Sequence, residues 1–281
     1  MLARRIVTAK ELLARTKPFV AVDATWFMPD SPRDAKKEYV SERLPGARFF
    51  DLDGVKTESP YPHMMPSKEQ FEQAIGEMGI RPNDFVVVYD KQSIFSSPRV
   101  RWMLEVFGHP QAVMLDNYAE YKRLGGPLES GEPEKVELAQ YSQPTQPLRW
   151  LSYEDLKSIV ETQPGEYHML DARPNGRFTG EVPEPRPGLA SGHVPGAKSL
   201  PFSEVVQQGE TAFKSDAELK AKLEKLEVLD GKPVIVMCGS GVTACVIKDA
   251  IDPFLKEPAL VYDGSWSEWG ARAPKELVER G

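Results

Sequence analysis

The stretch VIVMCGSGVTACV, Val234 to Val246, joins an apolar run to a segment that can form a helix, with a cysteine and two glycines at the junction. Four apolar residues in a row are typical of a strand buried in a parallel sheet. Gly239 and Gly241 permit a tight turn from this strand into a helix. In such a turn, backbone N–H groups and the positive end of the helix converge on the strand end. We therefore expect Cys238 to be a reactive thiolate rather than a small buried cysteine.

Runs of the same kind recur along the chain, at FVAVDA (19–24), FVVVYD (85–90) and YHMLDA (167–172). Segments with helical periodicity, such as SKEQFEQAIGEMG and DAELKAKLEKLE, separate them. Short apolar strands that alternate with helices indicate the α/β class, with a mainly parallel central sheet and helices on both of its faces.

The two halves of the chain repeat one another. Three pairs of residues recur at a spacing of 148, and a Pro-Gly-Ala triplet recurs at 150. The pairs are Asp23 and Asp171, Asp90 and Cys238, and Tyr121 and Trp269. Such a repeat predicts two similar domains, residues 1–126 and 148–281, joined by a linker at 127–147 that is rich in Pro, Gly, Glu and Gln. Because Asp90 stands where the second half has Cys238, only the second half has a thiol at this position.

Composition excludes several classes of protein. The 281 residues include 41% hydrophobic and 27% charged residues, and the formal net charge is −7. No apolar run approaches the roughly 20 residues that span a bilayer, and no basic cluster suits nucleic acid, so we expect neither partner. Two cysteines are too few for a disulfide framework or a structural zinc site, which favours a reducing compartment, the cytoplasm, and predicts no metal.

Spacing around Cys238 separates the reactions that such a loop performs. A cysteine phosphatase needs an arginine six residues after the nucleophile, and that position is Ala244. A nucleophile elbow needs glycines two residues on either side, and Val236 and Val242 break the pattern around Cys238 and Ser240. Sulfur transfer remains, in which the thiolate accepts a sulfur atom as a persulfide.

The motifs CGSGVTA (238–244), SGHVPGA (191–197) and YDGSWSEWGAR (262–272), with the tandem layout, resemble the rhodanese superfamily, and within it the sulfurtransferases that use 3-mercaptopyruvate. The resemblance covers essentially the whole chain. It implies two rhodanese-like domains of which only the second is catalytic, no cofactor, and pyruvate as a product. The loop has no basic residue, whereas family members that use thiosulfate typically do. The sulfur acceptor stays open between cyanide, a small thiol and a reduced thioredoxin-like protein.

The resemblance also assigns residues. Arg177 and Arg186 match an arginine clamp for the donor, whose carboxylate and carbonyl oxygen suit fork-shaped guanidinium groups. Ser240, His63 and Asp53 match a proposed Ser-His-Asp set, which gives the first half a role at a cleft between the domains. The loop residues expected to contact the donor are Gly239, Gly241, Val242 and Thr243.

Other residues have structural interpretations. We expect Cys245 to be buried and inert, Trp266 and Trp269 to be core aromatics, and His109, His168 and His193 to be structural or solvated. Two alternative functions stay open: a thiosulfate sulfurtransferase, and a non-catalytic rhodanese-like binding module.

Overall fold

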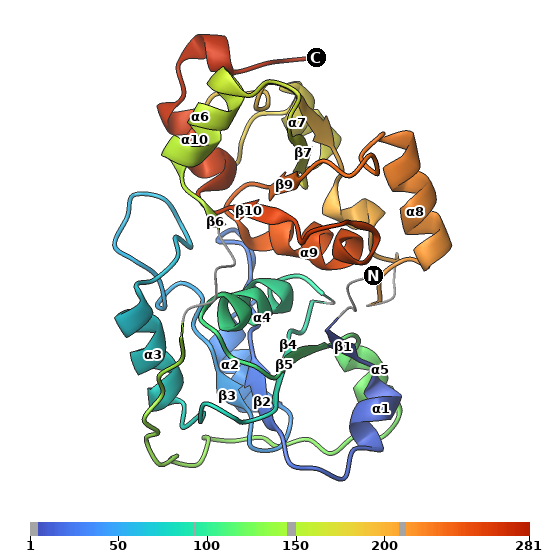
Figure 1. Ribbon diagram of the computed structural model, residues 1–281. Helices are drawn as coiled ribbons and strands as arrows, with labels where there is room; N and C mark the ends of the chain where they lie inside the picture. Colours follow the sequence, from blue (N-terminus) through green and yellow to red (C-terminus); the bar gives the residue numbers. More distant parts are fainter. Residues whose placement is uncertain (1–4, 93, 145–149, 208–211) are drawn as a thin grey trace.

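A five-stranded parallel sheet lies at the centre of each half of the chain (Figure 1). The computed structural model describes residues 5–92, 94–144, 150–207 and 212–281. Within them the strand order is β1-β5-β4-β2-β3 in the first half and β6-β10-β9-β7-β8 in the second. The two orders are identical once each strand is replaced by its counterpart, so the structure confirms the tandem α/β fold and the repeat.

The strands of the first half are β1 (Ile6–Val7), β2 (Val20–Asp23), β3 (Arg48–Phe49), β4 (Val86–Tyr89) and β5 (Ala112–Leu115). Its helices are α1 (Ala9–Leu13), α2 (Ala35–Ser41), α3 (Lys68–Glu77), α4 (Ser97–Val106) and α5 (Tyr118–Arg123).

The strands of the second half are β6 (Trp150–Leu151), β7 (His168–Asp171), β8 (Ala197–Ser199), β9 (Val234–Met237) and β10 (Leu260–Tyr262). Its helices are α6 (Tyr153–Thr162), α7 (Asn175–Thr179), α8 (Asp216–Lys225), α9 (Val242–Ile251) and α10 (Ser265–Arg272), with 3-10 turns at Phe202–Glu204, Asp252–Phe254 and Lys275–Leu277.

The apolar runs of the sequence become the central strands. All four residues of β4 and of β9 are buried, because these strands pair on both sides and apolar residues cover both faces of their sheets. Polar residues start most of the helices: Ser67 before α3 and Ser215 before α8 each form a capping box. Such caps satisfy backbone donors that the first turn leaves free.

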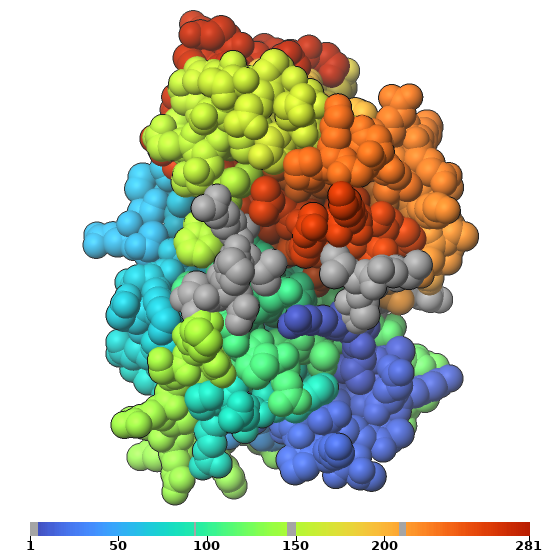
Figure 2. Space-filling model, in the orientation of Figure 1, coloured from blue at the N-terminus to red at the C-terminus, as the bar shows by residue number. Residues whose placement is uncertain are grey.

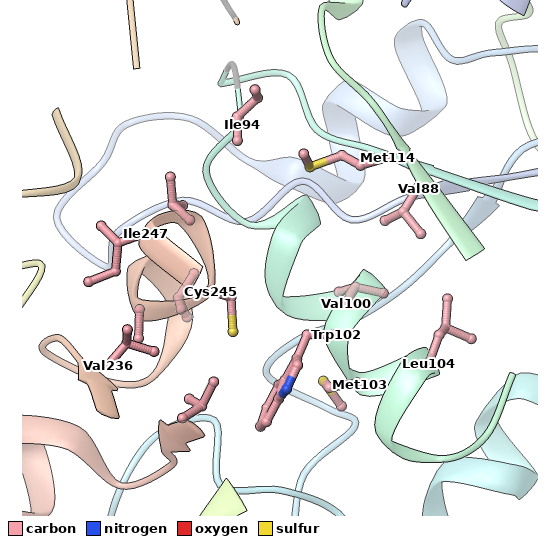
Figure 3. Packing of buried hydrophobic residues seen from close by; sticks show 14 of the residues in the cluster. Val88, Ile94, Val100, Trp102, Met103, Leu104, Met114, Val236, Cys245 and Ile247 are labelled. Carbon is pink, nitrogen blue, oxygen red and sulfur yellow. The ribbon is translucent and has the colours of Figure 1, made fainter. Parts of the chain in front are cut away.

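The two halves of the chain lie against each other (Figure 2). Helices α4 and α9, which hold equivalent places in the repeat, meet at this interface (Figure 1). The Cys245 side chain of α9 points toward Trp102 of α4 (Figure 3), and both lie in one cluster of buried residues with Val100 and Ile247. This cluster also contains residues of both sheets, so a single apolar core runs through the interface. Truncating a residue such as Trp102 to Ala is expected to cost about 3–5 kcal/mol of stability.

The segment expected to link the domains has no helix or strand between residues 131 and 144 and lies along the first half. The Ala139 amide donates to the carbonyl of Gly76, and the Tyr141 hydroxyl hydrogen-bonds the buried His109 at 2.9 Å. Earlier, Glu129 pairs with Arg43, just as Glu279 pairs with His193 in the second half. Residues 1–4 of the predicted first domain and 145–149, around the predicted 147/148 boundary, lie outside the described part of the chain. The domain limits stay a prediction.

Within the described part of the chain, no helix is long and apolar enough to cross a membrane.

Candidate active site between the two halves

The Cys238 loop follows a buried strand and leads directly into a helix. Cys238 comes after β9, α9 starts at Val242, and the cysteine is 2% exposed. The carbonyls of Cys238 and Gly239 accept hydrogen bonds from the amides of Trp266 and Ser267, in the first turn of α10. The amide of Cys238 donates to the Ser265 hydroxyl at 3.1 Å.

The following amides, from Gly239 to Thr243, have no acceptor among the described residues. The loop carbonyls therefore turn toward α10 and leave a series of donors for an anion next to Cys238.

Gly241 is required by both conformation and space. Its φ of +77° lies in the left-handed region, and a Cβ there would come within 2.7 Å of the Asp263 carbonyl oxygen and 3.0 Å of Arg99 Nη1. A side chain at this position would push the loop away from its support. The sequence predicted a tight turn at this position, and the left-handed φ of Gly241 is the conformation that such a turn needs.

The two predicted clamp arginines line the same cavity as Cys238. Arg177 lies on the short helix α7, and Glu184 holds its guanidinium: Nε lies 3.1 Å from Oε2, and Nη2 contacts the same oxygen. Among the described residues, Arg186 makes one hydrogen bond, a long one of 3.5 Å from Nη1 to the Ser267 hydroxyl. Burial and the neighbouring charge of Arg177 lower the pKa of Arg186. Arg186 thus has the freer fork to bind an incoming carboxylate.

The predicted Ser-His-Asp residues lie together, and they come from both halves. His63 Nδ1 is 3.1 Å from Ser240 Oγ, and His63 Nε2 is 3.1 Å from Asp53 Oδ1. The imidazole is buried, and the Trp26 ring contacts it edge-on at 4.8 Å between centroids. Trp26 Nε1 also donates to Asp53 at 2.8 Å. The hydrogen bond from His63 is the main cause that lowers the pKa of Asp53.

The cavity over Cys238 has a volume of about 270 Å³. The second half contributes the Cys238 loop, Arg173, the two clamp arginines and Phe202, while the first half contributes Trp26, Met28 and Phe95. Gly239, Val242 and Thr243 line the cavity, and their contact with the donor stays a prediction. Gly241 is not among the lining residues; its Cα lies against Asp263 and Arg99.

The apolar wall was not predicted from the sequence. Trp26 and Met28 follow β2, and Phe95 follows β4, at the carboxyl ends of parallel strands where ligands bind in open α/β sheets. Phe95 stacks near Trp26 and meets Phe202 of the other half edge-on at 5.6 Å between centroids. The position of Trp26, Met28 and Phe95 just after a buried strand was the sequence signal that could have identified them. Glu184, which holds Arg177, had no sequence signal.

The equivalent turn in the first half is already filled. Asp90 comes after β4, as Cys238 comes after β9, and its carboxylate accepts four backbone hydrogen bonds. Oδ1 accepts from Gln92, and Oδ2 accepts from Phe95, Ser96 and Ser97, all within 3.0 Å. At the repeat spacing of 148, Gln92 and Phe95 are the counterparts of Ser240 and Thr243, whose amides have no acceptor among the described residues. In the first half the protein's own anion takes these donors.

Residues given a structural interpretation lie away from this chemistry. The Cys245 thiol donates to the Gly241 carbonyl at 3.5 Å, burial raises its pKa to about 12, and both cysteines are free. Trp266 and Trp269 are fully buried in the core of the second half. His193 is stacked on Phe178.

A larger cavity, of about 730 Å³, lies between the first sheet and residues 129–137. Charged residues of both signs line it, together with Ser130, and none of the predicted site residues is among its lining residues. The smaller cavity, which holds Cys238 and both clamp arginines, is therefore the candidate active site.

Comparison with known proteins agrees with this geometry. Residues 152–272 match the model of the rhodanese-like domain. The chain is 37% identical to human 3-mercaptopyruvate sulfurtransferase over 272 residues, which cover 94% of this chain and 90% of that protein. The chain belongs to the tandem-domain rhodanese superfamily. The predicted resemblance to the 3-mercaptopyruvate sulfurtransferases of this superfamily is confirmed.

Two further similarities come from Saccharomyces cerevisiae. The protein named thiosulfate sulfurtransferase TUM1 is 36% identical over 277 residues, which cover 92% of this chain and 90% of that protein. The crystal structure of Tum1 superimposes with a TM-score of 0.91 at 32% identity and covers 100% of this chain and 99% of that one. The relatives support sulfurtransferase activity, and their names divide between two sulfur donors.

Proposed function

We propose that the protein transfers sulfur from 3-mercaptopyruvate to a thiophilic acceptor through a persulfide on Cys238. The observation that carries this proposal is the row of amides beside Cys238 that find no acceptor in the described part of the chain, in one cavity with Arg177 and Arg186. An anionic sulfur at Cys238 is stabilised by such donors, and an α-keto acid has the carboxylate that the arginines recognise.

The reaction has two halves. The Cys238 thiolate attacks the sulfur of the donor, the carbon–sulfur bond of the donor breaks, and its electron pair stays on carbon as the enolate of pyruvate. The proton of the donor thiol ends on that carbon, which completes pyruvate. Ser240 and His63 are placed to relay this proton, because the imidazole can accept it from the hydroxyl and return it, with Asp53 fixing the ring. Cyanide, a thiol or a thioredoxin-like protein then removes the outer sulfur.

A thiosulfate donor is the second candidate, since the yeast relative carries that name. Phe95, Trp26 and Phe202 give the cavity an apolar side, and the loop itself has no basic residue. Both features suit the methylene of 3-mercaptopyruvate better than a compact dianion. A non-catalytic binding module would use the same amides to hold an anion and needs no thiol there, whereas Cys238 lies in the cavity with both arginines.

Side-by-side kinetics with the two donors tests the assignment. Pyruvate release from 3-mercaptopyruvate and thiocyanate formation from thiosulfate are measured with cyanide as the common acceptor. We expect a higher kcat/KM with 3-mercaptopyruvate, loss of both activities in Cys238→Ser, and retention of both in the matched control Cys245→Ala. A higher kcat/KM with thiosulfate contradicts the donor, and activity in Cys238→Ser contradicts the mechanism.

A further inference from the structure

Arg99 is a fully buried arginine that reaches from the first half to the back of the Cys238 loop. It lies on α4, and its Nη2 donates to the His63 carbonyl at 2.6 Å and to Asp263 Oδ1 at 2.6 Å. Nη1 lies 3.4 Å from the Gly241 carbonyl. One guanidinium therefore contacts the backbone of the histidine and of the loop that carries Ser240.

Asp263 completes the arrangement from the second half. It follows β10, and its Oδ2 accepts the Met65 amide at 2.8 Å. The segment His63–Met65 is thus held at two points, by Arg99 at the first residue and by Asp263 at the third. Both side chains are at most 2% exposed, so water does not weaken these contacts.

His63 needs such support, because its backbone has a φ of +58°. A residue with a Cβ enters this left-handed region at a cost and keeps it only where its surroundings enforce it. Its ring has then to meet Ser240 on one side and Asp53 on the other. The contacts of Arg99 with the His63 carbonyl and of Asp263 with the Met65 amide supply this support.

We propose that Arg99 and Asp263 form a positioning pair, which holds the left-handed His63 turn so that the imidazole stays on Ser240. The inference rests on the proposed role of His63 in sulfur transfer. At the repeat spacing of 148, the counterpart of Arg99 in the second half is Ile247, so that position of α9 carries no arginine. The first half supplies it across the interface.

A second ion pair provides a matched control. Arg101 lies two residues further along α4 and binds Asp249 of α9 across the same interface, with Nε 3.1 Å from Oδ2. This pair is also buried, and neither member contacts the His63 turn or the Cys238 loop in the described structure. It therefore reports what the loss of an interdomain ion pair does to folding alone.

The test is a double-mutant cycle of Asp263→Asn and His63→Ala, with Asp249→Asn as the control. Pyruvate release is measured in a single turnover over a range of 3-mercaptopyruvate concentrations. Asp263→Asn is expected to lower the maximal rate by about 10- to 100-fold, since misplaced catalytic groups lose about that much. The donor concentration at half-maximal rate should stay within about twofold, because the clamp arginines are untouched. Asp249→Asn should leave both quantities unchanged.

The double variant decides the inference. If Asp263 acts through His63, adding Asp263→Asn to His63→Ala produces no further loss. Additive losses, or a wild-type rate in Asp263→Asn beside a slow His63→Ala, overturn the positioning pair. A wild-type rate in His63→Ala instead overturns the proposed role of His63, which is a distinct result.

Arg99→Lys repeats the test if Asp263→Asn does not give a folded protein by circular dichroism. A lysine keeps the charge, and its single ammonium cannot reach both His63 and Gly241 as the guanidinium fork does. We expect the same fall in maximal rate and the same lack of additivity with His63→Ala, and additivity again contradicts the inference.

Discussion

The Asp90 loop and the Cys238 loop occupy equivalent places in the two halves and differ in what fills them. Each follows the central strand of its sheet and leads into the helix at the interface. In the first half the carboxylate of Asp90 takes four backbone amides. In the second half the amides from Gly239 to Thr243 have no acceptor within the described ranges and lie beside a sulfur. The duplicated scaffold thus makes donors for an anion in both halves, and the residue at the strand end decides whether the protein or a reactant supplies that anion.

The Asp90 loop of the first half also forms part of the apolar wall of the cavity at Cys238. Its amides at Phe95 and Ser96 bind Asp90, which fixes Phe95 in the cavity of the other half. Ser96 in turn accepts the Trp26 amide at 3.2 Å. The first half therefore contributes rigid aromatic surface and a histidine, while the second contributes the nucleophile and the arginines. Four predictions test this division of roles.

Moving the thiol between the loops should have the largest effect. Asp90→Cys combined with Cys238→Ser places the only strand-end thiol in the first half, where no arginine clamp faces it. We expect sulfur transfer to fall by at least about a thousandfold, as for Cys238→Ser alone, because the nucleophile is lost from the cavity. Steady-state pyruvate release measures this. Recovered activity in the combined variant would show that the two loops are equivalent after all.

Replacing a clamp arginine should have the next largest effect. Arg186→Lys retains the charge and loses the fork, so we expect a higher KM for 3-mercaptopyruvate and a kcat/KM lower by about 10- to 100-fold, the value of a lost charge-assisted hydrogen bond. Arg123→Lys, an exposed arginine of the first half, is the control and should be neutral. Unchanged kinetics in Arg186→Lys removes this residue from the clamp.

Neutralising the anion of the filled loop should affect stability more than catalysis. Asp90→Asn keeps the shape of the side chain but weakens the hydrogen bonds from the Phe95, Ser96 and Ser97 amides. The free energy of unfolding is expected to fall by about 1–3 kcal/mol. Urea denaturation measures it, with the exposed Asp30→Asn as control. If the unfolding free energy does not change, Asp90 is not the internal anion of its loop.

The smallest expected effect concerns two equivalent aspartates, Asp116 in the first half and Asp263 in the second. They hold equivalent positions, since their amides donate to Val7 and Leu151, the last residues of β1 and β6. Asp263 binds Arg99, whereas burial raises the pKa of Asp116 from 3.8 to about 6.

Between pH 3.8 and about 6, Asp116 is protonated in the folded chain and ionised in the unfolded chain. The stability of the fold therefore decreases as pH rises through this range. Asp116→Asn should remove this fall and raise the melting temperature at pH 7 by about 2 °C. Melting curves from pH 4 to 7 measure it. A pH dependence that survives the substitution contradicts the assignment.

Much of the fold followed from the sequence because its signals are local. The runs before Asp90 and Cys238 are apolar without alternation, as strands buried on both faces require. The Pro-Gly-Ala triplets and the spacing of 148 indicated a repeat, and the glycines at 239 and 241 indicated the turn. These features depend on residues close together in the chain.

The parts that were missed depend on distant residues. Phe95 and Trp26 enter the cavity only because α4 packs on α9, and no local pattern encodes that packing. Arg99 looks like an ordinary helix arginine until the interface places it under Gly241. Glu184 reaches Arg177 through a loop of irregular backbone, for which sequence patterns predict no geometry.

The most direct test of the account is the site of sulfur after reaction with the donor. The protein is incubated with 3-mercaptopyruvate without acceptor, alkylated, digested and analysed by mass spectrometry of the peptides. We predict one additional sulfur atom on Cys238, none on Cys245, and none on the introduced cysteine of Asp90→Cys. A Cys238 peptide without added sulfur while pyruvate is released, or sulfur on the cysteine at position 90, would contradict the claim that the open amides at Cys238 make it the sulfur acceptor.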